Sequence, residues 1–182
     1  MIFSLYIFNR QGFNIHYQAF GRNRSSKMPL QEEFKLVFGL IYSIRGISQK
    51  LGPAFSAKEN FTSYQTNTYK LTLLTVPSGT KFILLTDPNR STENVTQALQ
   101  ELYSRTFYNY VVRHSKWMKI MKFTEEENGR RVETVGENIG EGVVEHLDAS
   151  GNKIVNYKMV SYLNKTFAEE TGKYMESLPF YS

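Results

Sequence analysis

The hydrophobic pattern of residues 2–20 predicts a β-hairpin at the start of the chain. Bulky residues occupy both sides of an extended segment, with Phe3, Leu5 and Ile7 on one side and Ile2, Tyr6 and Phe8 on the other. A strand that is apolar on both faces is typical of the middle of a sheet covered on both sides. Residues 10–12 then predict a short turn, and alternation resumes over residues 13–20, which predicts the second strand.

Three later segments repeat their hydrophobic residues every three or four positions, which predicts amphipathic helices. The first begins at Pro29 and runs for about six turns, until residues 52–53 (Gly-Pro) end it. The second begins after Ser91, a favourable N-cap residue, and extends to about His114. The third is shorter and is indicated by Val160, Leu163, Phe167, Tyr174 and Leu178.

The remaining regular segments predict strands. Three lie between the first two helices, at residues 60–66, 68–76 and 81–86. Residues 143–147 and 153–157 are compatible with a small additional hairpin. The main elements follow the order β-β-α-β-β-β-α-α. This order predicts an α+β fold in which a five-stranded antiparallel sheet carries helices on both faces, as a single domain over residues 1–182.

The charge is unevenly distributed along the chain. Residues 1–122 contain 16 basic and 6 acidic residues, whereas residues 123–152 contain 2 basic and 8 acidic residues. Residues 124–148 are also rich in glycine and glutamate, which predicts a mobile loop. Lys116–Phe123, just before it, is basic and apolar and is compatible with an extension of the second helix, a short separate helix, a membrane-interface segment or a partner-groove segment. A basic body of this kind can meet nucleic acid, an anionic membrane or an acidic protein.

The residues suggest no chemistry of their own. The chain has no cysteine, which excludes disulfides, thiolate metal sites and a cysteine nucleophile. The histidines His16, His114 and His146 lack the spacing of metal ligands, and residues 136–142 lack the lysine of a phosphate-binding loop. The aromatic residues follow core spacing, so we expect no nucleic-acid platform. We therefore expect no catalytic residue, no cofactor and no metal.

The apolar N-terminal segment, residues 1–8, is too short for a signal peptide or a membrane-spanning helix. We therefore expect a soluble intracellular protein.

Four segments carry a family resemblance. Ser4–Gly12 resembles a family opening in which Asp is usual at the position of Asn9, and Glu32–Arg45 resembles the family's first helix. Tyr64–Leu71 resembles a strand pair, and Ser177–Phe180 resembles a closing "SLPF". In this order the segments resemble the longin-fold (sybindin-like) subunits of the TRAPP vesicle-tethering complex, in particular the smallest of these subunits. The resemblance covers about residues 1–122 and 158–182, so residues 123–157 stand as an acidic insertion.

The resemblance implies a longin (profilin-like) fold and a non-catalytic core subunit of a complex that is the guanine-nucleotide exchange factor for an early-secretory Rab GTPase. It implies other TRAPP subunits as partners, namely a longin paralogue and the TRAPP subunit 3-like family. The Rab GTPase and the membrane would be met through the assembled complex, in the cytoplasm at cis-Golgi and endoplasmic reticulum membranes. A small chain of a vesicle coat adaptor and a longin SNARE-like protein remain as alternatives with the same fold.

The resemblance further implies that the subunit pairs side by side with another longin subunit through its first helix and the adjoining strand, which directs attention to the helix face opposite the predicted core residues. That face offers Lys35, Gly39, Tyr42, Arg45 and Gly46. Glycine lets another backbone approach closely, and tyrosine and arginine are frequent interface anchors. We therefore expect these five residues to contact a partner subunit or the GTPase.

Overall fold

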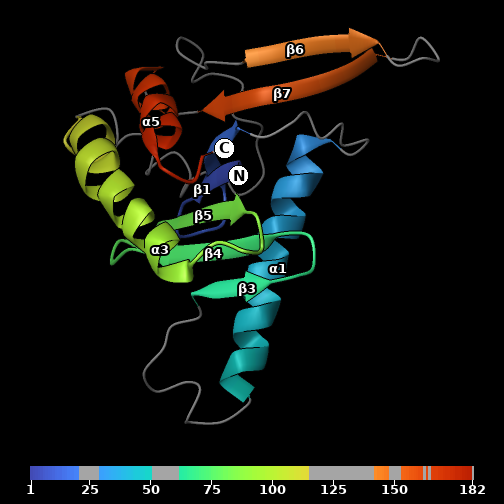
Figure 1. The fold of residues 1–182 in the computed structure, drawn as a ribbon, viewed down its shortest axis with the longest axis vertical. Coiled ribbons are helices and arrows are strands. Elements are labelled where there is room, and N and C mark those ends of the chain that lie inside the picture. The colour runs from blue at the N-terminus through green and yellow to red at the C-terminus, as the bar shows by residue number, and fades with distance from the viewer. Residues whose placement is uncertain are drawn as a thin grey trace.

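A computed structural model describes residues 1–20, 29–50, 62–114, 142–147, 153–161, 163 and 165–181. Within these residues the chain forms one antiparallel sheet of seven strands in the order β3-β4-β5-β1-β2-β7-β6, with helices on both faces (Figure 1). The strands are β1 (Ile2–Phe8), β2 (Asn14–Ala19), β3 (Ser63–Gln65), β4 (Lys70–Thr75), β5 (Lys81–Thr86), β6 (Gly142–Leu147) and β7 (Lys153–Ser161). The helical segments are α1 (Leu30–Lys50), α3 (Thr92–Glu101), η1 (Leu102–Val112) and α5 (Lys165–Ser177).

The first strand lies in the middle of the sheet, as its two apolar faces predicted. Strand β1 pairs with β2 on one side and with β5 on the other. Leu5 and Ile7 belong to the core beneath α3, η1 and α5, whereas Tyr6 and Phe8 belong to the core beneath α1. The prediction was wrong for Ile2, which lies in the same core as Leu5 and Ile7. The reason is a β-bulge between residues 2 and 4, which shifts the alternation.

The predicted long helices are present, and they lie on opposite faces of the sheet (Figure 1). Helix α1 has 21 residues, which agrees with about six turns; the predicted end at residues 52–53 lies outside the described residues. The second helix is continuous, but from Leu102 its backbone adopts π-helical hydrogen bonding. Periodicity did not predict this change. Ser91 occupies the N-cap position, but its side chain makes no capping hydrogen bond.

The sheet is wider than the five strands predicted for its main body. The five predicted strands are contiguous, and the compatible hairpin at 143–157 forms as β6 and β7. Strand β7 pairs with β2, with Tyr17 opposite Val160, so the hairpin extends the sheet to seven strands. Val160 therefore lies in a strand and not, as predicted, in the third helix, which begins at Lys165. The loop prediction is wrong for residues 142–147, which form β6. Lys116–Phe123 and the acidic tract lie outside the described residues.

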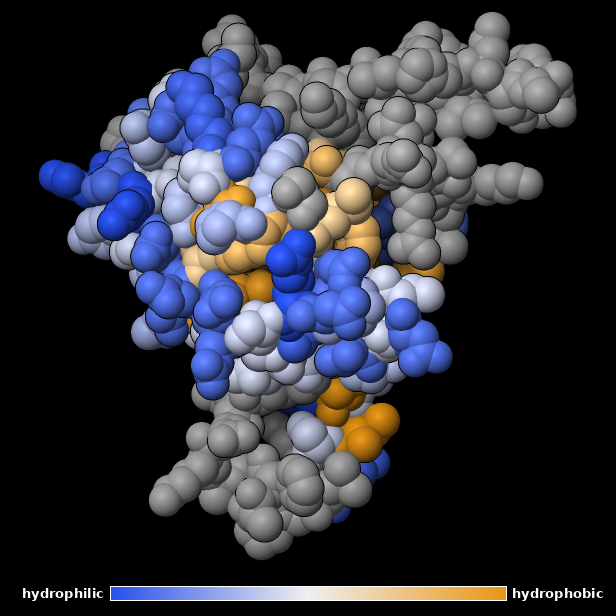
Figure 2. Space-filling model, in the orientation of Figure 1, coloured by the Kyte–Doolittle hydropathy of each residue, from blue (hydrophilic) through white to orange (hydrophobic). Residues whose placement is uncertain are grey.

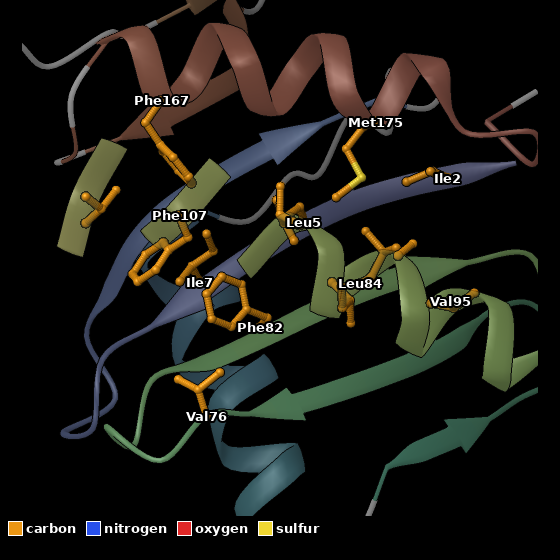
Figure 3. Packing of buried hydrophobic residues seen from close by; sticks show 14 of the residues in the cluster. Ile2, Leu5, Ile7, Val76, Phe82, Leu84, Val95, Phe107, Phe167 and Met175 are labelled. Atoms are coloured by element: carbon orange, nitrogen blue, oxygen red, sulfur yellow. The ribbon is translucent and has the colours of Figure 1, made fainter. Parts of the chain in front are cut away.

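The larger hydrophobic core joins the sheet to the second and third helices (Figure 3). It is built from aromatic and aliphatic side chains of β1, β5, α3, η1 and α5, among them Leu5, Phe82, Leu84, Val95, Phe107, Phe167 and Met175. The region covered by α1 is a separate, smaller core. None of the helices among the described residues is both long and apolar enough to cross a membrane.

Candidate partner-binding face of helix α1

Aromatic packing holds one side of α1 against the sheet. Phe34 lies edge-on to Tyr6, with ring centroids 6.1 Å apart, and Phe38 lies 5.5 Å from Phe8. Ile41, one turn further on, is almost fully buried. These contacts determine which side of the helix faces the core, and therefore which side is left for a partner.

A hydrogen bond adds a polar anchor to this packing. The hydroxyl of Tyr6 donates to the Glu33 carboxylate over 2.6 Å. Tyr6 is almost fully buried. Burial raises the pKa of the Tyr6 hydroxyl, and the negative charge of Glu33 raises it further. Tyr6 therefore stays protonated and available as a donor at neutral pH.

Replacing Tyr6 with phenylalanine should lower the free energy of unfolding by about 1.5 kcal/mol, because a hydrogen bond to a charged group is lost. The value lies at the lower end of the usual range because Glu33 is only half-buried and water can solvate it. Urea unfolding followed by circular dichroism measures the change. Tyr17→Phe is the matched control, since it removes a hydroxyl in the same core that is not the donor to Glu33. Equal losses in the two variants would contradict the assignment.

Four of the five predicted site residues share the outward side of α1. Lys35, Gly39, Tyr42 and Gly46 are spaced by four, three and four residues, which places them on one helical stripe. Lys35, Gly39 and Tyr42 are exposed, and Tyr42 keeps 75% of its surface accessible. A Cβ atom built on Gly39 or Gly46 would meet nothing within 4 Å. Another backbone can therefore approach the helix at both glycines.

Arg45 lies on a different side of the helix. It follows Ile41 by four residues, so it continues the stripe that faces the sheet and not the outward stripe. Arg45 is nevertheless exposed. Its positive charge contributes to lowering the pKa of Lys81, at the start of β5, after the larger effect of burial. Arg45 thus acts on the first residue of β5 and is separate from the stripe formed by the other four residues.

Two apolar residues of the outward face escaped the sequence analysis. Leu36 and Ile47 are each 59% exposed. They are eleven residues apart, which is close to three turns, so they lie on one side of α1 beside Gly39. Figure 2 shows hydrophobic surface over the lower end of α1, where the helix extends beyond β3 in Figure 1. The sequence did contain a signal for their exposure, because Leu36 and Ile47 are apolar but do not fall on the helical stripe of predicted core residues.

The face has the composition of a protein interface. It combines large exposed side chains, which supply contact area, with glycines that permit close approach. We define the outward face of α1 by its residues Lys35, Leu36, Gly39, Tyr42, Gly46 and Ile47. The described residues contain no group of three or more His, Asp or Glu placed to hold a metal ion.

Comparison with known proteins shows what the chain as a whole is similar to. The model of the Sybindin-like family matches residues 2–134. Over 113 residues the chain is 33% identical to trafficking protein particle complex subunit 1 of Rattus norvegicus, covering 62% of this chain and 76% of the relative. The subunit of the same name from Dictyostelium discoideum is 33% identical over 115 residues, which cover 63% and 79%. Subunit BET5 of the complex from Saccharomyces cerevisiae is 35% identical over 101 residues, which cover 56% and 60%.

Proposed function

Because this chain belongs to the Sybindin-like family, we propose that it is a core subunit of a trafficking protein particle (TRAPP) complex. The assembled complex acts as the guanine-nucleotide exchange factor for an early-secretory Rab GTPase and tethers vesicles between the endoplasmic reticulum and the Golgi. This subunit contributes no catalytic residue of its own. The support is the similarity to proteins named as subunits of this complex in Rattus norvegicus, Dictyostelium discoideum and Saccharomyces cerevisiae.

Within that complex the subunit holds its neighbours. Its outward α1 face binds a longin-fold paralogue, and subunits of the TRAPP subunit 3-like family complete the assembly. The Rab GTPase and the cis-Golgi and endoplasmic reticulum membranes are reached through the complex, from the cytoplasm. The observation that carries this role is the exposure of Leu36, Tyr42 and Ile47 beside two open glycines on a helix that is otherwise packed on the sheet.

The variant Tyr42→Glu should reduce capture of the longin paralogue at least about tenfold, because it removes an aromatic anchor and introduces charge at the interface. Pull-down with the purified paralogue measures the loss. The matched control is Tyr108→Glu. Tyr108 is also an exposed tyrosine, but it lies on η1. Wild-type capture by the first variant, with an unchanged circular dichroism spectrum, would refute the α1 interface.

Affinity purification of the chain from its own cells tests the wider assignment. Recovery of TRAPP subunits is the expected result, whereas recovery of coat subunits or of a SNARE bundle would replace it with one of the other longin functions.

A further inference from the structure

Two tight turns meet at one end of the sheet and bring together cations that are far apart in the sequence. Phe8 at the end of β1 pairs with Lys81 at the start of β5, so the turn after β1 lies beside the turn before β5. Figure 3 shows the two turns next to each other. Arg10 belongs to the first turn and Lys81 follows the second, while Arg45 approaches from α1. We call Arg10, Arg45 and Lys81 the basic corner.

Close packing gives the corner a defined shape. Gly79 has a φ of +86°, and a Cβ atom there would lie 2.9 Å from Cγ of Arg10, so the Arg10 stem lies directly against the second turn. Gly12 has a φ of +96°, and a Cβ atom there would lie 2.7 Å from the Phe38 ring. The ammonium of Lys81 sits 5.5 Å from the centre of that same ring and donates a hydrogen bond to the Gly79 carbonyl. Both turns and α1 are thus packed together at the corner.

The charges of the corner are mutually repulsive. The pKa of Lys81 is lowered first by burial, then by Arg45 and then by Arg10, and no carboxylate is among these causes. Three cations in this arrangement raise the local positive potential, which an incoming anion would relieve. Arg10 and Arg45 are exposed and Lys81 is half-buried, so all three are within reach of a ligand.

We propose that the basic corner binds an acidic segment of a partner protein, through carboxylates that pair with Arg10, Arg45 and Lys81. Arginine pairs with carboxylates in a bidentate geometry, and Lys81 retains N–H donors beyond the one given to Gly79. Recognition of anionic lipid by a basic segment typically uses about four to eight cations, more than the three that the described part of the chain assembles at the corner. This site goes beyond the proposed role of the outward α1 face, because Arg10 comes from the turn after β1 and Lys81 from β5, and neither belongs to α1.

The test compares two double variants of the full chain that remove the same charge. Arg10→Gln with Lys81→Gln removes two corner cations, and glutamine keeps the Cβ and Cγ atoms that cover Gly79. Arg105→Gln with Arg113→Gln removes two exposed cations from the other face of the molecule. The probe is a fluorescein-labelled peptide that alternates pairs of glutamates with glycine, and binding is followed by fluorescence anisotropy at low ionic strength.

The corner variant should bind the peptide roughly tenfold more weakly, while the control variant binds nearly as well as the wild type. The single variant Arg10→Gln, at an exposed position, gives the same direction of change if the double variant unfolds. Equal losses in both double variants would show an effect of net charge and overturn the site, as would unchanged binding.

Binding to vesicles of phosphatidylcholine and phosphatidylserine forms a second arm of the test. A loss confined to vesicle binding would replace the protein partner with a membrane. Capture of the longin paralogue by the corner variant should be retained, so failure of this site is distinguishable from failure of the α1 interface.

Discussion

Replacement of Phe107 with alanine is expected to lower the free energy of unfolding by about 3–5 kcal/mol, the usual cost of removing a fully buried aromatic ring. Phe107 lies in η1 and is almost completely buried. Its ring centre is 5.0 Å from that of Phe82 in β5 and 5.8 Å from that of Phe167 in α5 (Figure 3). Alanine would leave a cavity where these three elements meet, and none of them can close it without moving the other two.

Urea unfolding of the wild type and the variant measures this loss. Tyr108→Ala is the control, since it removes an aromatic ring from the next residue of the same π-helix, where 47% of the side chain is exposed. The control should lose less than about 1 kcal/mol, as surface substitutions usually do. A Phe107→Ala loss no larger than that of the control would mean that η1 does not depend on the core for its attachment.

Acidification should destabilise the chain through His16. This residue is fully buried in β2, and its ring lies edge-on to Phe167 at 5.1 Å between centres. Burial lowers the pKa of His16 from 6.5 to about 4, although a hydrogen bond with Gln18 opposes the shift. Below pH 6.5 the unfolded chain therefore binds a proton that the folded chain excludes, so folding loses stability as the pH falls toward 4. The contribution of His16 amounts to about 2 kcal/mol between about pH 7.5 and about pH 5.

The wild type and His16→Gln, each unfolded with urea at the two pH values, isolate this contribution. Carboxylates titrate in both proteins, whereas the imidazole titrates only in the wild type. The wild type should thus lose about 2 kcal/mol more than the variant on acidification. Equal losses in the two proteins would show that protonated His16 is accommodated in the folded chain.

The outward face of α1 shows what helical periodicity can predict about the candidate site and what it cannot. Spacing alone predicted that Lys35, Gly39, Tyr42 and Gly46 would lie together, and the first three are exposed while Gly46 is half-buried with open space beside it. Arg45 is exposed as well, but it follows Ile41 by one turn, and its charge acts on Lys81 at the start of β5. Arg10 and Lys81 are distant from Arg45 in the sequence, so no local sequence pattern could have predicted that the three cations form one basic corner.

Local pattern indicated the additional hairpin but not its attachment to the sheet. The segment that includes β6 was expected to be a loop because it is rich in glycine and glutamate, with a small hairpin over residues 143–147 and 153–157 as a compatible reading, and the hairpin forms as β6 and β7. The pairing of β7 with β2 then attaches the hairpin to a strand more than a hundred residues earlier. The distant pairing involves β7 alone, and such cross-strand context can outweigh the weak propensity of the hairpin for strand structure.

The sequence by itself determined the family, the order of the main elements, the central position of β1 and the existence of an outward stripe on α1. These follow from motifs and from the period-two and period-3.6 repeats of hydrophobic residues, which are local properties of the chain. Only the tertiary structure decided the bulge at Ile2, the pairing of β7 with β2 and the meeting of Arg10, Arg45 and Lys81. The physical reason is that each of these depends on contacts between distant segments, whose packing can override local preference.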